Sequence, residues 1–183
     1  VKDVNEKDQY GNSLMGSLNL EILKKVHSLG GKINDTTNTK GMVLTLISQA
    51  LYWVQPEVVE YLLKNGADPL KKAEYNECAW DYAVQTISCT KEDYLKGLDL
   101  LMEYAPIDLN EHRYQQDEKY KAYDLFEHAA AAGNFTICLW LLDNGFKLQP
   151  RHKECIKEEF FPDWEEEEKK DHKKLWEITQ KLK

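Results

Sequence analysis

A helix that ends in an abrupt stop recurs along this chain, and this recurrence limits the possible folds more than any other feature. The clearest copy spans residues 58–69. Its apolar residues recur at helical spacing and form one stripe: Val58, Val59, Leu62 and Leu63. Gly66 then ends the helix, because glycine accepts the left-handed conformation that satisfies the last carbonyl groups. Pro69 prevents an immediate restart of the helix.

Three further stretches follow the same plan: residues 20–34, 97–110 and 135–146. A period of this length predicts stacked helical units, because one unit cannot bury its apolar face alone. At 183 residues the chain is long enough to bury a sizeable core. We therefore expect a single domain in which residues 1–150 form four units, at about 4–35, 36–69, 70–110 and 111–150.

Residues 151–183 are predicted to close the stack as a pair of capping helices, at 152–160 and 163–182. Asp163 is a suitable N-cap for the second of these helices, with Glu166 as its capping-box partner. Acidic residues near its start and lysines in its later part match the helix dipole. A polar-faced cap keeps stacked units soluble, so we assign this segment to the same domain.

The sequence also predicts the helices inside the units. Helices of units two and four are expected at residues 45–54, 57–64 and 123–132. Pro56 fits the opening turn of the helix at 57–64, because the N–H that proline lacks is unpaired there in any case. The polar run 34–41 predicts a hairpin or loop and not a strand of a sheet, and residues 88–94 are expected to be an insertion between the helices of unit three.

Charge narrows the class of partner. The chain has 32 acidic and 24 basic residues and a formal net charge of -8, which argues against nucleic acid because phosphate binding needs a concentrated basic surface. The excess of acid favours a protein partner with a basic surface, or serves solubility alone. No apolar run is long enough to predict a membrane span. We expect a cytoplasmic protein, and a removed leader stays open because the chain begins at Val1.

The cysteines are scattered and form no C-x-x-C pair: Cys78, Cys89, Cys138 and Cys155. This scatter favours reduced thiols, with two disulfides as the alternative. His152 and Cys155 would lie on one helix face, but zinc usually takes three or four protein ligands and no second pair has matching spacing. We therefore predict no metal site and no cofactor.

The repeated unit resembles the ankyrin repeat. That unit has a β-turn, a first helix that opens with T-P-L-H-x-A, and a second helix that ends with L-L-x-x-G-A-D/N. Residues 58–69 match the second half closely. The sequences C-A-W-D-Y-A at 78–83 and D-L-F-E-H-A at 124–129 occupy the place of T-P-L-H-x-A, and Gly133 and Asn134 match the turn between the helices.

The resemblance covers about residues 4–150 and implies an all-α fold: an ankyrin-like α-solenoid of stacked helix pairs with β-turn or hairpin loops. Unit one is short, units two and three carry insertions, and no complete T-P-L-H occurs. We therefore expect an irregular stack.

In the ankyrin family, partners bind the concave side, which is built from turn tips and first-helix surfaces. The resemblance carries these positions over to Tyr10, Tyr52, Trp53, Glu74, Tyr75, Glu77, Gln85, Tyr120, Lys121 and Tyr123, with Gln9, Asn12 and Thr86 beside them. The set is rich in Tyr and Trp, as binding hot spots are, although several of these rings could instead pack against insertions or adjacent units. Acidic residues at its edge suit a partner that presents Lys or Arg.

These observations favour a non-enzymatic protein–protein binding module, expected as a monomer. Its role could be that of a stoichiometric inhibitor or immunity-type protein that neutralises a partner, or of a host-directed effector or a scaffold or adaptor fragment. The competing hypothesis is an enzyme with a pocket that gathers Cys89, His112 or the C-terminal acids. No G-x-S-x-G, P-loop, G-x-G-x-x-G or H-E-x-x-H sequence occurs, so the enzyme hypothesis is the less favoured one.

Overall fold

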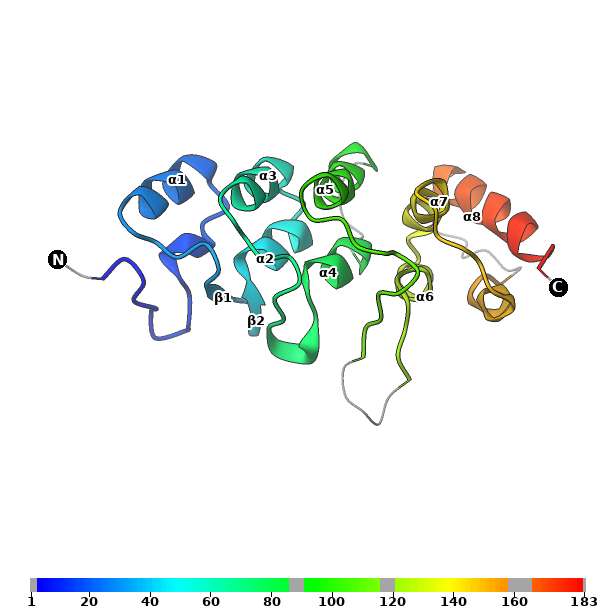
Figure 1. The fold of residues 1–183 in the computed structure, drawn as a ribbon, viewed down its shortest axis with the longest axis horizontal. Helices are drawn as coiled ribbons and strands as arrows, with labels where there is room; N and C mark the ends of the chain where they lie inside the picture. Colours follow the sequence, from blue (N-terminus) through cyan, green and yellow to red (C-terminus); the bar gives the residue numbers. More distant parts are fainter. Residues whose placement is uncertain (1–2, 86–90, 116–120, 158–165, 183) are drawn as a thin grey trace.

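The computed structural model describes residues 3–85, 91–115, 121–157 and 166–182 (Figure 1). These parts of the chain are mostly helical, with one small antiparallel hairpin. The α-helices are α1 (Leu20–Ser28), α2 (Leu46–Tyr52), α3 (Pro56–Lys64), α4 (Ala79–Gln85), α5 (Lys91–Tyr104), α6 (Leu125–Ala131), α7 (Phe135–Asp143) and α8 (Glu166–Thr179). The short 3-10 helices are η1 (Leu14–Gly16), η2 (Glu74–Asn76) and η3 (Pro150–Cys155), and the strands are β1 (Thr36–Thr39) and β2 (Met42–Thr45).

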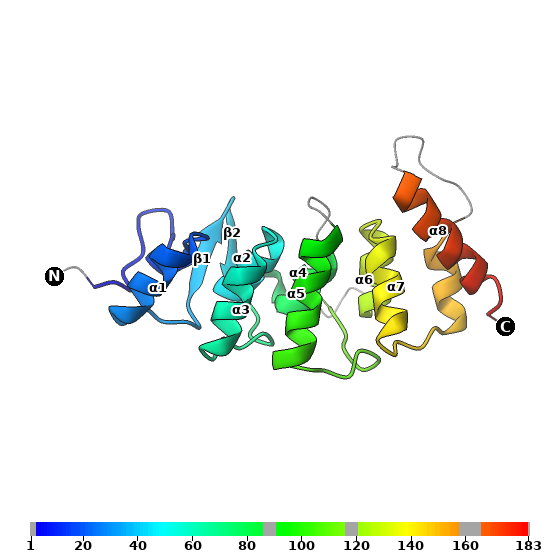
Figure 2. The same cartoon turned by 90° about the horizontal axis from the view of Figure 1, so that it is seen from above.

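The helices lie in two layers along the long axis of the molecule (Figure 1). One layer contains α1, α3, α5 and α7, and the other contains α2, α4 and α6. Helices that follow one another along the chain pack together, as α2 with α3, α4 with α5 and α6 with α7. Each pair also packs on the next, through α2 with α4, α4 with α6, α3 with α5 and α5 with α7 (Figure 2). The two ends of the chain therefore lie at opposite ends of the molecule.

Helix α3 confirms the predicted plan of an apolar stripe and a glycine stop. Pro56 stands at the first helical position, and all four residues of the stripe are buried: Val58, Val59, Leu62 and Leu63. Burial of such side chains stabilises the fold by about 1.5–3 kcal/mol each. Gly66 has φ 85°, the left-handed conformation expected for the stop, and Gly145 after α7 has φ 92°.

The apolar core runs through every helix pair, from Met15 in η1 to Leu175 in α8. Cys78 and Cys138 are buried in it. Helix α8 packs on α7 and on η3, so the C-terminal segment closes the end of the row. Within the described residues, no helix is both long and apolar enough to cross a membrane.

The hairpin predicted at residues 34–41 is confirmed, but the expectation that this run contains no strand of a sheet is wrong. Residues Thr36–Thr39 pair antiparallel with Met42–Thr45 in register Thr36↔Thr45 and Thr39↔Met42. Lys40 and Gly41 form the turn with φ 51° and 88°, the two positive values that a type I′ hairpin turn requires. Threonine is β-branched and favours this conformation, so a polar run can still form a strand.

Two other helices have bounds that differ from those expected from the sequence. Helix α5 begins at Lys91, so residues 91–94 of the expected insertion are helical. The helix expected at 152–160 is the 3-10 helix η3 at 150–155. Residues 88–90 and Asp163, the expected N-cap, lie outside the described residues, and α8 begins at Glu166.

Candidate functional site

Large exposed side chains stand on successive turns along one side of the molecule. We call this side the turn edge and define it by Tyr10, Val43, Tyr75 and Tyr123, which are 67%, 38%, 43% and 41% exposed. The hairpin β1–β2 and the turns beside it project below the helix layers in the view of Figure 1. Beside Tyr10 the surface is hollowed into an open cavity of about 530 Å³ whose lining includes Gln9 and Asn12. Contact area and concavity thus occur together at this end of the turn edge.

Hydrogen bonds between neighbouring turns hold the turn edge in one arrangement. The Asn38 amide donates to Gly11 O at 3.1 Å, and the Val43 amide donates to Glu74 Oε2 at 2.8 Å. Farther along, the side-chain amide of Asn76 donates to Gln115 O at 2.7 Å. Tyr114 and Tyr123 form an isolated β-bridge with two bonds of 2.8 Å. Because these turns are already ordered, they lose little conformational entropy when a partner binds.

Tyr75 occupies an unusual backbone conformation. Its φ is 64° and that of Asn76 is 62°, a left-handed region that bulky residues rarely adopt. The turn is closed by the Ala73 amide, which donates to Glu77 O at 3.2 Å. Residues held in such conformations cost roughly 1–3 kcal/mol and cluster at functional sites. Tyr75 is therefore displayed by its turn at some cost to stability.

The predicted contact residues divide into exposed and inward-facing groups. Glu74 and Lys121 are exposed, and the Lys121 ammonium lies 5.8 Å from the centre of the Tyr123 ring. The half-buried Tyr52 and Trp53 form an aromatic group in which Tyr52 meets Trp53 and Tyr82 edge-on at 5.3 and 6.4 Å. The Lys40 ammonium, on the hairpin turn, lies 4.4 Å from the centre of the Trp53 ring.

Glu77 and Gln85 are engaged with each other instead of facing outward. Glu77 is buried and accepts a hydrogen bond of 2.8 Å from Gln85 Nε2. Tyr120 and Thr86, two further predicted positions, lie outside the described residues.

Behind the turn edge, a buried polar group surrounds the start of α4. We call it the α4 cluster: Glu77, Cys78, Asp81 and His112. The Cys78 amide donates to Asp81 Oδ2 at 2.9 Å, and His112 Nε2 lies 2.9 Å from Asp81 Oδ1. One ligand-type atom each from Cys78, Asp81 and His112 lies within 4.8 Å of the others. The α4 cluster thus ties the loop before α6 to the start of α4.

Burial sets the protonation of the α4 cluster. Burial raises the pKa of the Cys78 thiol to about 12, and the Asp81 charge adds to this effect. Burial also raises the pKa of Asp81, but the hydrogen bond and charge of His112 outweigh it, so the pKa is lowered. Burial and the charges of Glu77 and Asp81 raise the pKa of Tyr114 to about 12. At neutral pH the Asp81 carboxylate therefore stays ionised, and Cys78 and Tyr114 stay protonated.

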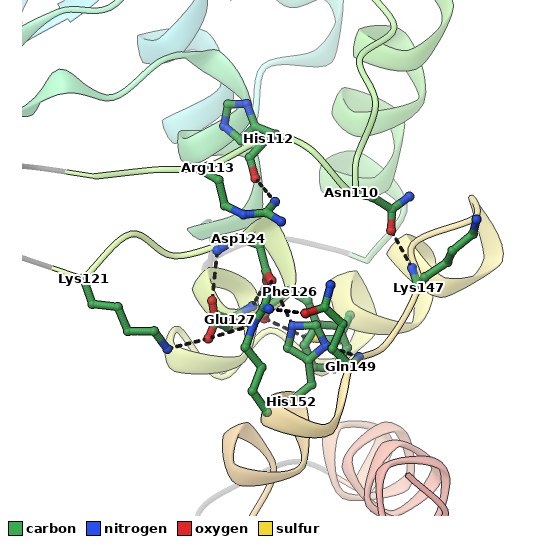
Figure 3. Close-up of polar contacts among 12 residues, drawn as sticks. Asn110, His112, Arg113, Lys121, Asp124, Phe126, Glu127, Lys147, Gln149 and His152 are labelled. Atoms are coloured by element: carbon green, nitrogen blue, oxygen red, sulfur yellow. Dashed lines mark hydrogen bonds and ion pairs between the residues drawn. The ribbon is translucent and has the colours of Figure 1, made fainter. Parts of the chain in front are cut away.

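A second polar group, whose carboxylates and histidine are buried, surrounds the start of α6 (Figure 3). We call it the α6 cluster: Lys121, Asp124, Glu127, Arg151 and His152. Asp124 and Glu127 form a reciprocal capping box at the start of α6. Asp124 Oδ2 accepts from Arg151 Nη2 at 2.6 Å and lies 2.8 Å from His152 Nε2, while Lys121 Nζ donates to Glu127 Oε1 at 2.8 Å.

The α6 cluster holds the carboxylate of Asp124 in its charged form. Burial raises the pKa of Asp124, but His152, the Glu127 amide and Arg151 together hold it well below its usual range. His152 is fully buried, accepts from the Gln149 amide through Nδ1 at 2.9 Å, and packs beside the rings of Phe126 and Phe146. This arrangement joins η3 to α6.

Sequence reasoning missed both clusters as units. The α6 cluster did leave a sequence signal. Asp124 and Glu127 are three residues apart, the spacing of a capping box, and Gln149 and His152 have the same spacing. The α4 cluster had no comparable signal, because His112 joins Asp81 from 31 residues away in a polar loop.

The described thiols are not activated for nucleophilic chemistry. Cys78, Cys138 and Cys155 are unpaired, and Cys89 lies outside the described residues. Burial raises the pKa of Cys138 well above its usual value and that of Cys155 to about 11, so both are protonated at neutral pH. No family model matches the sequence, and a search of curated proteins finds no match. Function must therefore be argued from the geometry.

Proposed function

We propose that this chain is a non-enzymatic protein-binding module that contacts another protein through the turn edge. The observation that carries this proposal is the row of exposed side chains on turns that are hydrogen-bonded to one another: Tyr10, Val43, Tyr75 and Tyr123. A tyrosine ring gives a large contact area at low entropic cost, and its hydroxyl remains usable at a wet rim. Tyr52 and Trp53 extend the same surface toward the first helices.

The proposal includes an ankyrin-like α-solenoid as the scaffold. Helices that pack in pairs, glycine stops and projecting turns support it. A shared N-cap also supports it. At the start of α2 the Thr45 side chain accepts from the Ser48 amide at 3.2 Å, and at the start of α6 the Asp124 side chain accepts from the Glu127 amide at 2.9 Å. Q-P-R-H at 149–152 adds a further partial copy of the first-helix opening, beyond the units expected from the sequence.

Within this class, a stoichiometric inhibitor of the immunity type is the favoured role, with an effector or a scaffold fragment as the alternatives. The net charge of -8 supports a basic partner, and a compact acidic protein with aromatic contacts suits neutralisation of one target. The protonated state of Cys78, Cys138 and Cys155 argues against thiol catalysis by these three residues, whereas Cys89, the thiol of the competing hypothesis, lies outside the described residues. The cytoplasmic location and the monomeric state stay predictions.

The test is affinity capture from the native source with quantitative mass spectrometry, comparing the wild type with Tyr75→Ala plus Tyr123→Ala. We expect recovery of the partner to fall at least about tenfold, because truncated hot-spot residues cost about 2 kcal/mol or more each. Tyr104→Ala is the matched control. Tyr104 is similarly exposed (38%), but it is the last residue of α5 and is not part of the turn edge. Equal recovery of the same partner by the double variant would refute the turn edge as the binding surface.

A further inference from the structure

The α4 cluster contains less positive charge than its carboxylates call for. Glu77 and Asp81 are both buried. Among the described residues His112 is the basic side chain that bonds to Asp81, whereas Glu77 accepts a hydrogen bond from Gln85 Nε2. In the α6 cluster, Asp124 and Glu127 meet Lys121, Arg151 and His152. Buried carboxylates need paired charge or metal coordination to offset their desolvation. The α4 cluster therefore has fewer basic partners for its carboxylates than the α6 cluster.

The atoms that face one another in the α4 cluster are metal ligands. Thiolate, imidazole and carboxylate bind zinc at about 2.0–2.3 Å, so ligand atoms in a tetrahedral site lie about 3–4 Å apart. Asp81 Oδ1 and His112 Nε2 are already 2.9 Å apart, and the Cys78 sulfur, one carboxylate oxygen of Asp81 and one ring nitrogen of His112 lie within 4.8 Å of one another. A shift of about an ångström would complete the geometry. Asp81 Oδ2 can keep its hydrogen bond from the Cys78 amide, because a different oxygen of the carboxylate faces His112.

We propose that Cys78, Asp81 and His112 bind a divalent transition-metal ion of the zinc class, with water in the fourth position. The ion replaces the thiol proton of Cys78, which passes to solvent, and forms one bond each to sulfur, oxygen and nitrogen. Two ligand charges then balance the divalent ion. This site does not depend on the proposed protein-binding function.

The metal would fasten the loop before α6 to the start of α4. His112 lies two residues before Tyr114, whose β-bridge positions Tyr123 of the turn edge. Binding therefore adds a bond between segments that are otherwise joined here by the Asp81–His112 pair.

The test uses the full chain, treated with chelator under reducing conditions and titrated with Co²⁺. We expect one equivalent to produce a thiolate-to-cobalt charge-transfer band, which Zn²⁺ then displaces. Cys78→Ser should abolish the band, and His112→Gln should weaken binding at least about 100-fold while keeping a donor for Asp81. Cys155→Ser is the matched control, because it removes a described thiol outside the α4 cluster and should leave the band unchanged.

Thermal unfolding provides a second readout. A ligand that binds the native state alone raises the unfolding midpoint, so Zn²⁺ should stabilise the wild type and Cys155→Ser but not His112→Gln. Circular dichroism of the metal-free variants checks that each one folds. The proposal is overturned if folded wild type gives no charge-transfer band, or if the band persists in Cys78→Ser. Either result would leave Asp81–His112 as an ion pair that serves the fold alone.

Discussion

The α4 and α6 clusters solve the same structural problem with different chemistry. In each, a buried carboxylate near the start of a helix is joined by a histidine from a later segment, 31 residues after Asp81 and 28 residues after Asp124. The α6 cluster balances its carboxylates with an arginine, a lysine and a histidine. The α4 cluster has a thiol and a single histidine instead. The difference teaches that a similar arrangement can hold its carboxylates with several basic side chains or with few, and the proposed metal ion would supply the missing charge in the α4 cluster.

The largest expected effect is the loss of unfolding free energy when the central carboxylate of each cluster is removed. Asp124→Ala should lower the free energy of unfolding by about 3–5 kcal/mol, because it leaves the buried His152 and the neighbouring Arg151 without their shared partner. Asp81→Ala should cost about 1–3 kcal/mol, because it removes one histidine contact and one capping bond in metal-free protein. Urea unfolding with chelator present measures both. Equal losses would contradict the charge contrast between the clusters.

Acidification should produce a smaller loss of stability through the same residue, Asp124. The pKa of Asp124 is lowered in the folded protein by His152, the Glu127 amide and Arg151, which outweigh the effect of burial. Its contribution is therefore complete above its ordinary pKa of 3.8 and is lost as pH falls toward the folded-state value. In Asp124→Asn the urea midpoint should start lower at neutral pH and fall less steeply on acidification. A wild-type slope in this variant would show that Asp124 does not carry the acid sensitivity.

The smallest effect concerns Arg151. Its side chain is 38% exposed, so solvent screens its bonds to Asp124 and Glu127. We expect Arg151→Gln to cost about 1 kcal/mol or less, with the difference from wild type shrinking as salt is added. The exposed pair of Lys169 and Glu166 in α8 provides the control, and Lys169→Gln should change the urea midpoint still less. A loss as large as that of Asp124→Ala would mean that Arg151, and not His152, dominates the α6 cluster.

Local sequence rules were sufficient for α3. Its stripe and stop were predicted correctly because apolar spacing, Pro56 and Gly66 act within one or two turns of the chain. They offered a hairpin at residues 34–41 but missed its strand, in which polar threonines pair across the turn of Lys40 and Gly41. The predicted contact residue Glu77 is buried because Gln85, one helix away along the chain, bonds to it.

The sequence by itself determined the succession of helices, their stops and the surplus of tyrosines available for the turns, because each depends on spacing and composition over short stretches. Tertiary structure alone decided which tyrosines stay exposed, since the links between turns leave Tyr75 and Tyr123 outside while Tyr82 is buried. It also decided the two clusters. His112 and His152 reach their carboxylates across some thirty residues, and the packing of successive helix pairs brings them there. A pairing at that separation leaves no periodic signal in the chain.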